Sequence, residues 1–288
     1  MSVYDVVTER IIEYIEKNAV LPWTKPWATV NTVNQNFKSR APYSGINILL
    51  TGMSGFSSPY WLTFKQTKEF GGTVKKGEKA TPVIFWSTFE KKEDAEDDVD
   101  KPKARGFHRM YFVFNAEQIE GIDFPSLGSP RSIEFNPLEE AENIVANMPK
   151  CPSVKHRGQK AFYAPALDAV TVPKPEHFES AEHYYSTLFH ELAHSTGHPS
   201  RLNRFAIEGT NHRFGSKSYS KEELVAEMSS AFILNSIGIN TENSDRNSAA
   251  YIKSWLTALM NDPKLVVTAA SKAAKAADYI MNKEVKHV

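Results

Sequence analysis

The pattern of apolar and polar positions predicts a helix at the start of the chain and more helix at its far end. Residues 3–17 place apolar side chains at the spacing of one helix face, at Val6, Val7, Ile11, Ile12 and Ile15. Prolines 22 and 26 prevent this helix from continuing. A last helical region is predicted over 247–282, with a break near Pro263.

The middle of the chain alternates in a way that is typical of strands. Residues 80–90 and 109–119 are two β-rich runs, and they are predicted to pair as a hairpin. The segment 90–101 between them has seven acids against three lysines, which indicates a solvated loop. Residues 124–137 then concentrate proline, glycine and serine. We therefore expect an α+β fold of two domains, 1–125 and 137–288, joined by a linker over 126–136.

The second half begins with a helix over 137–149 that Pro137 opens. Residues 160–173 alternate like a strand or hairpin, and a helix is predicted over 184–196. Another helix is predicted over 219–238, with Ser220 as its N-cap and Glu223 three residues later, as in a capping box.

The predicted helix over 184–196 carries a metal-binding pattern, HELAH. His190 and His194 are four residues apart, so a helix places both imidazoles on one face, where they can bind one ion. Glu191 lies beside them and can take a proton from a water that the ion activates. The alternative is a helix that carries two surface histidines by chance.

A third ligand would decide between these readings. A metzincin needs a histidine at position 200, and this chain has Ser200 there. The later helix offers Glu222, Glu223 and Glu227 instead. Glu223, followed by Ala226 and Glu227, resembles the E-x-x-A-[DEN] pattern in which gluzincin-like peptidases place the ligand first. We expect Glu227 to hold a ligand histidine from outside the ligand set, and Glu222 to lie on a solvated helix face.

The N-terminal half interleaves cations and aromatic rings. Residues 21–80 hold eight lysines and arginines against Glu69 and Glu78, together with nine aromatic residues. Aromatic faces stack bases and cations follow phosphates, so this composition is compatible with single-stranded nucleic acid. The candidate contacts are Trp23, Lys25, Trp27, Tyr43, Trp61, Lys65, Lys75, Lys76 and Lys79. The alternative is that the rings form a core, which is the interpretation for Phe85, Trp86, Phe112 and Phe114.

Composition narrows the class of protein. The chain has 288 residues, balanced charge, one cysteine, Cys151, and no run of 18 apolar residues. No internal disulfide and no transmembrane helix are therefore expected. The N-terminus lacks the basic start and apolar centre of a signal peptide, which favours a cytoplasmic protein.

Taken in order, the motifs resemble those of the ArdC-type antirestriction proteins of conjugative plasmids. The N-terminal half carries LPWTKPW, PYSGINILL, YWLTFKQ, GGTVKKGEK and VFNAEQIEG, and the C-terminal half carries AFYAPALD, HELAHSTGHPSRLNR and YSKEELVAE. The resemblance covers nearly the whole chain, and its N-terminal part also resembles the front of certain plasmid primases. The acidic segment 90–101 lies outside the matching motifs.

The resemblance implies a domain that binds single-stranded DNA without sequence preference, followed by a zincin-like metallopeptidase domain. It also implies that the protein protects incoming plasmid DNA from host restriction and that its protein substrate is DNA-bound. In this reading His190, His194 and Glu223 bind Zn²⁺, or another divalent ion such as Mn²⁺, and Glu191 is the general base. Two rivals stay open: a protein that blocks restriction by occupying DNA and has a structural or vestigial metal site, and a regulatory peptidase whose basic half binds another protein.

Overall fold

The computed structural model describes most of the chain. The described residues are 2–24, 33–88, 106–125, 137–205, 217–239 and 249–283. Several predictions fall outside these ranges: the DNA contacts Lys25 and Trp27, the acidic segment 90–101 and the linker 126–136.

The first helix forms where the apolar pattern predicts it. Helix α1 spans Val3–Asn18, and a capping box between Ser2 and Asp5 starts it. Its apolar side is buried at Val7, Ile11 and Ile15. The chain then passes through a 3₁₀ turn, η1 (Pro22–Thr24), as the prolines predict.

A four-stranded sheet forms the base of the N-terminal half. Its strands are β1 (Gln35–Asn36), β2 (Tyr60–Thr63), β4 (Thr81–Thr88) and β5 (Gly106–Asn115), in the order β1-β2-β5-β4. The predicted hairpin is confirmed, because β4 and β5 pair antiparallel along their length. Helix α2 (Ile46–Gly52) is tied to β4, since the Asn47 side chain bonds the backbone N–H and C=O of Ile84 at 2.8 and 2.7 Å.

Smaller elements complete this half. Helix α3 (Phe64–Glu69) follows β2 directly, and β3 (Thr73–Val74) pairs with β6 (Ile119–Glu120). A 3₁₀ turn, η2 (Ala116–Gln118), lies between β5 and β6.

The C-terminal half consists of a small sheet and a stack of helices. Its helices are α4 (Pro137–Asn147), α5 (Ala181–Ser195), α7 (Lys217–Ser236), α8 (Ala249–Asn261) and α9 (Leu265–Ile280). Its strands are β7 (Ser153–His156), β8 (Phe162–Ala164) and β9 (Ala169–Val172), in the order β7-β9-β8, with 3₁₀ turns η3 (Pro165–Leu167) and η4 (Pro175–His177) after β8 and β9.

Most helix boundaries agree with the sequence pattern. The break near Pro263 separates α8 from α9, as predicted. The predicted N-cap at Ser220 is wrong, because α7 already begins at Lys217 and Ser220 lies inside it. Capping-box residues therefore do not start a helix when the preceding residues are helical as well.

The two halves share one hydrophobic core. Val7 and Ile11 of α1 and Leu49 of α2 belong to the same buried cluster as Phe189 of α5 and Ile233 of α7. The Thr8 hydroxyl also donates to the carbonyl of Pro263, at 2.8 Å. The N-terminal helices are thus part of the packing that supports the C-terminal helices.

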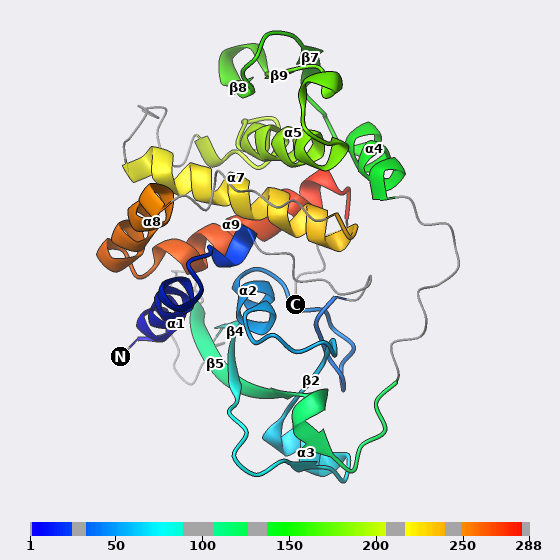
Figure 1. The fold of residues 1–288 in the computed structure, drawn as a ribbon, viewed down its shortest axis with the longest axis vertical. Helices are drawn as coiled ribbons and strands as arrows, with labels where there is room; N and C mark the ends of the chain where they lie inside the picture. The colour runs from blue at the N-terminus through cyan, green and yellow to red at the C-terminus, as the bar shows by residue number, and fades with distance from the viewer. Residues whose placement is uncertain are drawn as a thin grey trace, which may run out of the picture.

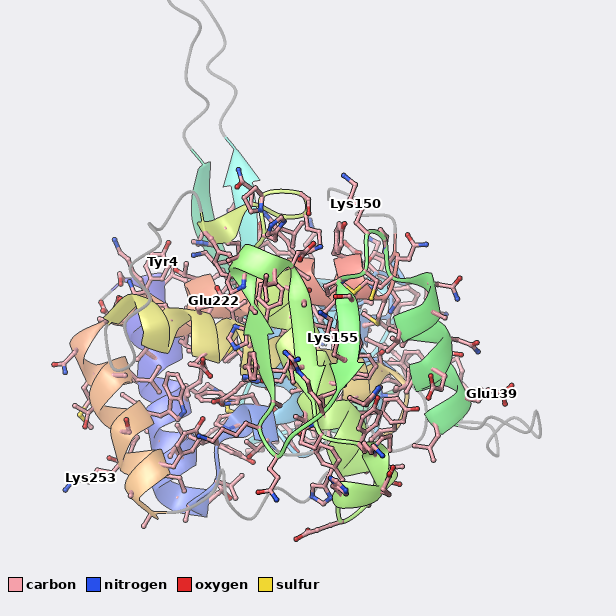
Figure 2. The ribbon with its side chains drawn as sticks, turned by 90° about the horizontal axis from the view of Figure 1, so that it is seen from above. Tyr4, Glu139, Lys150, Lys155, Glu222 and Lys253 are labelled. Carbon is pink, nitrogen blue, oxygen red and sulfur yellow. The ribbon has the colours of Figure 1, made fainter. Side chains whose placement is uncertain are left out.

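The elements are stacked in layers along the long axis (Figure 1). From top to bottom these are the small sheet, α5, α7, α9 with α8 beside it, α1 and α2, and then the four-stranded sheet with α3. Seen from above, the small sheet lies in front of the helices (Figure 2). The observed mixture of helices and sheets confirms the α+β class. None of the helices in the described ranges combines the length and the apolar character that spanning a bilayer requires.

Candidate metal centre

Helix α5 holds the two histidines in fixed positions. It begins after Ser180, whose hydroxyl accepts a hydrogen bond from the backbone N–H of His183 at 3.3 Å. Its apolar side chains, Leu188, Phe189 and Leu192 among them, are buried in the shared core. Burial of that face leaves His190 and His194 together on the side that meets α7.

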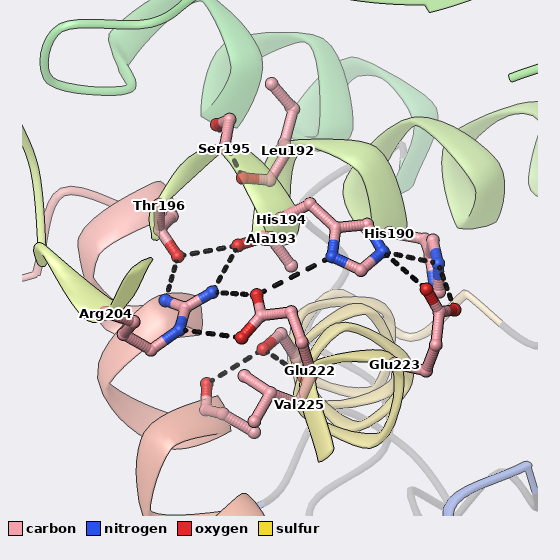
Figure 3. A network of polar contacts seen from close by, with 12 residues as sticks. His190, Leu192, Ala193, His194, Ser195, Thr196, Arg204, Glu222, Glu223 and Val225 are labelled. Carbon is pink, nitrogen blue, oxygen red and sulfur yellow. Dashed lines mark hydrogen bonds and ion pairs between the residues drawn. The ribbon is translucent and has the colours of Figure 1, made fainter. Parts of the chain in front are cut away.

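Helix α7 packs against α5 and brings Glu223 to the histidines (Figure 3). The Nε2 atoms of His190 and His194 are 3.1 Å apart. The Glu223 carboxylate lies 3.5 Å from the first and 3.4 Å from the second. Within the described residues, these three side chains form the one group whose ligand atoms are close enough to hold an ion, all within 4.8 Å of one another.

This donor set fits a divalent metal ion. Two nitrogen ligands of a tetrahedral zinc ion, each about 2.0–2.1 Å from it, lie roughly 3.3 Å apart. The two imidazoles have nearly that separation. Two nitrogens and one carboxylate also make the donor set of catalytic zinc sites, which keep a fourth position for water.

Glu191 lies next to His190 in the same helix and is buried, with 7% of its surface exposed. A carboxylate at this place is close to the centre along the chain without being one of the clustered ligand atoms. Its type and position are those that the sequence assigns to a general base.

Glu222 contradicts the expectation of a solvated helix face. It is only 5% exposed, and its carboxylate lies 3.6 Å from Nδ1 of His194. The guanidinium of Arg204 donates two hydrogen bonds to it, at 3.2 and 2.5 Å. Arg204 lies in the turn after α5, outside any periodic pattern, so its partnership with Glu222 gave no signal in the sequence.

Electrostatics at the centre favour a positive charge. Burial lowers the pKa of His194, but the carboxylates of Glu222 and Glu223 outweigh burial and raise this pKa to about 10. Burial raises the pKa of Glu223, and the two histidines outweigh this and hold it well below its ordinary value. A divalent ion held by these residues would take the place of this positive charge, with His194 binding it as neutral imidazole.

Glu227 lies one turn after Glu223 on α7 and is buried. Its carboxylate accepts a hydrogen bond from the indole N–H of Trp23 at 2.9 Å and one from the Tyr251 hydroxyl. These bonds join α7 to η1 and α8. The predicted support of a ligand histidine by Glu227 stays a prediction.

Three of the aromatic residues predicted to contact DNA lie in the interior. Trp23, Tyr43 and Trp61 are 2%, 4% and 0% exposed. The interpretation of these rings as open stacking surfaces is therefore wrong. Trp61 packs with Tyr43 and Val83 in a small core on one face of the sheet, and its indole N–H donates to Asn34 at 3.0 Å.

Other aromatic residues are open instead. Phe64, Phe85, Tyr111 and Phe112 are among the exposed large side chains. The interpretation of Phe85 and Phe112 as core residues is wrong, whereas Phe114 is half-buried and packs against a small core. The side chain of Trp86 lies outside the described part of the structure. Hydrophobic pattern alone did not distinguish the two sets, because burial depends on which other segments pack against each ring.

The predicted cationic contacts that lie within the described residues are accessible. Lys65 on α3 is exposed, as are Lys75, Lys76 and Lys79 in the turn between β3 and β4. Lys75 also donates to the backbone carbonyl of Glu117 at 2.7 Å. Beside them, the Lys68 ammonium lies 5.7 Å from the centre of the exposed Phe64 ring.

Two family models match the chain in succession. The model of the N-terminal domain of anti-restriction factor ArdC matches residues 1–114. The model of a zincin-like metallopeptidase matches residues 139–272, which include His190, His194 and Glu223.

Solved structures and sequence relatives agree with these matches. The metal-free crystal structure of the antirestriction protein ArdC from plasmid R388 is similar at a TM-score of 0.74, with 33% identity, 99% of this chain and 100% of that chain covered. Its Mn(II)-bound structure is similar at a TM-score of 0.74 and 32% identity, with both chains fully covered. A Sinorhizobium fredii protein, y4eC, is 34% identical over 97% of this chain and 91% of its own length.

Two DNA primases TraC of Escherichia coli match only in part of their length. One is 37% identical over 99% of this chain and the other 35% identical over 99%. This chain spans 20% of the first primase and 27% of the second. The likeness therefore concerns one region of each primase.

Proposed function

The chain belongs to the ArdC family of antirestriction proteins, and from this premise we propose that it combines non-specific binding of single-stranded DNA with a zinc-dependent peptidase. In this proposal it protects incoming plasmid DNA from host restriction during conjugation by acting on proteins bound to that DNA. The donor set of His190, His194 and Glu223 is the observation that carries the peptidase part.

The peptidase proposal assigns one role to each residue of the centre. His190, His194 and Glu223 would hold the ion through one atom each. A bound divalent ion supplies a water of lowered pKa and polarises the carbonyl group of a peptide bond. Glu191 would accept the proton of that water and donate it to the leaving amine. Zn²⁺ suits two nitrogens and one carboxylate, and Mn²⁺ is the alternative that the Mn(II)-bound relative suggests.

The edge of the small sheet is an argument for a peptide substrate beside this centre. Strand β8 is at one edge of the order β7-β9-β8, and α5 contacts both β8 and β9. Two apolar side chains, Phe162 on β8 and Leu167 on η3, are exposed at 45% and 70%. An extended peptide can add to such an edge through backbone hydrogen bonds and place its side chains on exposed apolar groups.

The DNA part rests on the exposed cations and rings of the N-terminal half. Lys65, Lys75, Lys76 and Lys79 would follow phosphates, and exposed rings such as Phe64 would stack bases. Tethering the peptidase to DNA in this way raises the effective concentration of proteins on the same strand.

The substitution Glu191→Gln tests the peptidase proposal. The amide is nearly isosteric, so the fold and the bound metal should persist, but it cannot take the water's proton at neutral pH. We expect the wild-type protein, incubated with single-stranded DNA and a DNA-bound protein, to cleave that protein, and Glu191→Gln to cleave none.

Glu179→Gln is the control, because Glu179 is an exposed acid just before α5. It should cleave as the wild type does. If Glu191→Gln protects DNA from restriction as well as the wild type does, the peptidase model is wrong. A protein that blocks restriction by occupying the DNA then takes its place.

A further inference from the structure

We propose that Arg204 is a positioning residue for the metal centre, which acts on His194 through Glu222. The inference rests on the proposed metal site and extends it to two residues that bind no ion themselves. Glu222 fixes the ring of His194, and Arg204 fixes Glu222.

Glu222 faces the side of the His194 ring that points away from the other ligands. Nε2 of His194 lies 3.1 Å from Nε2 of His190 and 3.4 Å from Glu223, whereas Nδ1 lies 3.6 Å from Glu222. A carboxylate on that side favours a proton on Nδ1 and leaves the lone pair of Nε2 for the ion. It also resists rotation of the ring, which would turn Nε2 away (Figure 3).

Arg204 holds Glu222 in this orientation from the opposite side. Its Nε and Nη2 donate to the two carboxylate oxygens at 3.2 and 2.5 Å. Its remaining donors bond the end of α5, with Nη2 on the carbonyl of Ala193 at 2.9 Å and Nη1 on the Thr196 hydroxyl at 2.5 Å. Arg204 therefore links residues on either side of His194 to the residue before Glu223, and so fixes the spacing of the two ligand-bearing helices.

The turn after α5 is shaped to return Arg204 to this place. The backbone N–H of Leu202 bonds the carbonyl of Thr196 at 2.9 Å, and that of Phe205 bonds the carbonyl of Gly197 at 3.1 Å. A Cβ atom at Gly197 would lie 2.5 Å from the Phe205 ring. Glycine at this position thus allows the close approach that brings Arg204 under the helix.

Only arginine suits these contacts. The planar guanidinium offers five donors in a fixed fork, which match a carboxylate at two points and leave further donors for the helix end. A lysine keeps the charge but presents a single point, so it cannot fix both oxygens of Glu222 and cap α5 at once. Arg204→Lys therefore keeps the positive charge at this position but removes the contacts that orient the Glu222 carboxylate.

The experiment measures metal affinity in the full-length protein, with Zn²⁺ and separately with Mn²⁺, in competition with a chromophoric chelator. Arg204→Lys should bind each ion about 10- to 100-fold more weakly than the wild type, which is the usual effect of losing support outside the ligand set. In the zinc-loaded protein, the proton on Nδ1 of His194 should exchange with water faster, as seen by NMR.

Arg201→Lys is the matched control. Arg201 lies in the same turn, pairs with Asp168, and bonds the Ser195 carbonyl at the end of α5 at 2.7 Å, but the carboxylate it holds does not face a ligand histidine. The Arg201→Lys variant should have a lower thermal stability than the wild type, and its metal affinity should stay within about twofold of the wild-type value. Equal losses of affinity in both variants would show a general effect of the turn and overturn the proposal.

Glu222→Gln keeps the test decisive if Arg204→Lys fails to fold. The amide preserves size and removes the charge that faces His194. With a wild-type circular dichroism spectrum, it should still bind the ions about tenfold more weakly, and unchanged affinity would overturn the proposal. A wild-type protein that binds neither ion would instead refute the metal site itself, so the two failures are distinguishable.

Discussion

Trp23 donates a hydrogen bond from its indole nitrogen to Glu227, which lies 2.9 Å away and 204 residues later in the chain. Both side chains are buried. Glu227 is one helical turn beyond Glu223, so the bond ties the N-terminal segment to the helix that carries the proposed metal ligand. The region that matches the ArdC N-terminal model is therefore a structural support of the region that matches the peptidase model.

Trp23→Phe should destabilise the protein by about 1–3 kcal/mol, the cost of leaving a buried acceptor without one of its donors. Urea denaturation of the wild type and the variant measures the difference in the free energy of unfolding.

Trp255→Phe is the control for lost indole packing. Trp255 is buried against Trp23, and within the described part of the chain its indole N–H has no hydrogen-bond partner. Its replacement removes ring area without removing a hydrogen bond. An equal loss of stability in both variants would show that packing, and not the bond to Glu227, makes Trp23 important.

The proposed metal centre also predicts which substitutions should abolish metal binding. His190→Ala and Glu223→Ala should each abolish stoichiometric binding of Zn²⁺, because each removes one of three protein ligands. Metal analysis after dialysis measures the metal content per chain. His183→Ala, in the first turn of the same helix, should keep a full equivalent of zinc, and retention by His190→Ala would place the ion elsewhere.

The sequence predicted local features of this protein better than contacts between distant segments. The spacing of His190 and His194 predicted a shared helix face, since that geometry depends on one element alone. The clustering of Glu223 with them followed a motif, and the structure brings these residues together. Glu222 was misread, because its burial depends on Arg204, which reaches it from a turn 18 residues earlier.

The predicted burial of several aromatic residues was wrong for the same physical reason. Trp61 and Phe85 are both large rings in β-rich segments, and nothing in their own sequence says which will be covered. Trp61 packs against Tyr43 and Phe56, which come from other segments, whereas Phe85 stays 43% exposed although its ring centre lies 6.4 Å from that of Tyr43. Burial is therefore decided by tertiary packing and not by residue type.

Asp168 predicts a pH dependence of stability. Its hydrogen bond with Arg201 outweighs burial and holds the pKa of Asp168 below its ordinary value. A depressed pKa contributes stability above the unfolded value of about 3.9, and this contribution is lost as the pH falls through the folded value. Asp168→Asn should therefore be less stable than the wild type at neutral pH, and the difference in urea midpoints should shrink towards pH values below about 4. A constant difference would contradict this role of the charge.

The proposed DNA-binding surface predicts how affinity for single-stranded DNA depends on salt. Replacing Lys75, Lys76 and Lys79 together with glutamine should flatten the dependence of single-stranded DNA affinity on salt, because each lost phosphate contact removes about 0.7 from the slope of log affinity against log salt. Fluorescence anisotropy with a labelled oligonucleotide at several salt concentrations measures that slope. The charge-matched control replaces Lys155, Lys160 and Lys253, which are exposed in the C-terminal half, and it should leave the slope unchanged.

Phe64→Ala separates stacking from charge on the same surface. The Phe64 ring is 55% exposed beside Lys68, so its loss should weaken single-stranded binding by about 1–3 kcal/mol without changing the salt slope. Leu167→Ala is the matched control, since this apolar side chain is exposed on η3 in the other half, and it should leave DNA affinity unchanged. Duplex DNA should bind more weakly than the single strand, because its paired bases have no free faces to stack. The stacking proposal is wrong if duplex and single strand bind with equal affinity and Phe64→Ala has no effect. DNA binding would then rest on phosphate contacts alone.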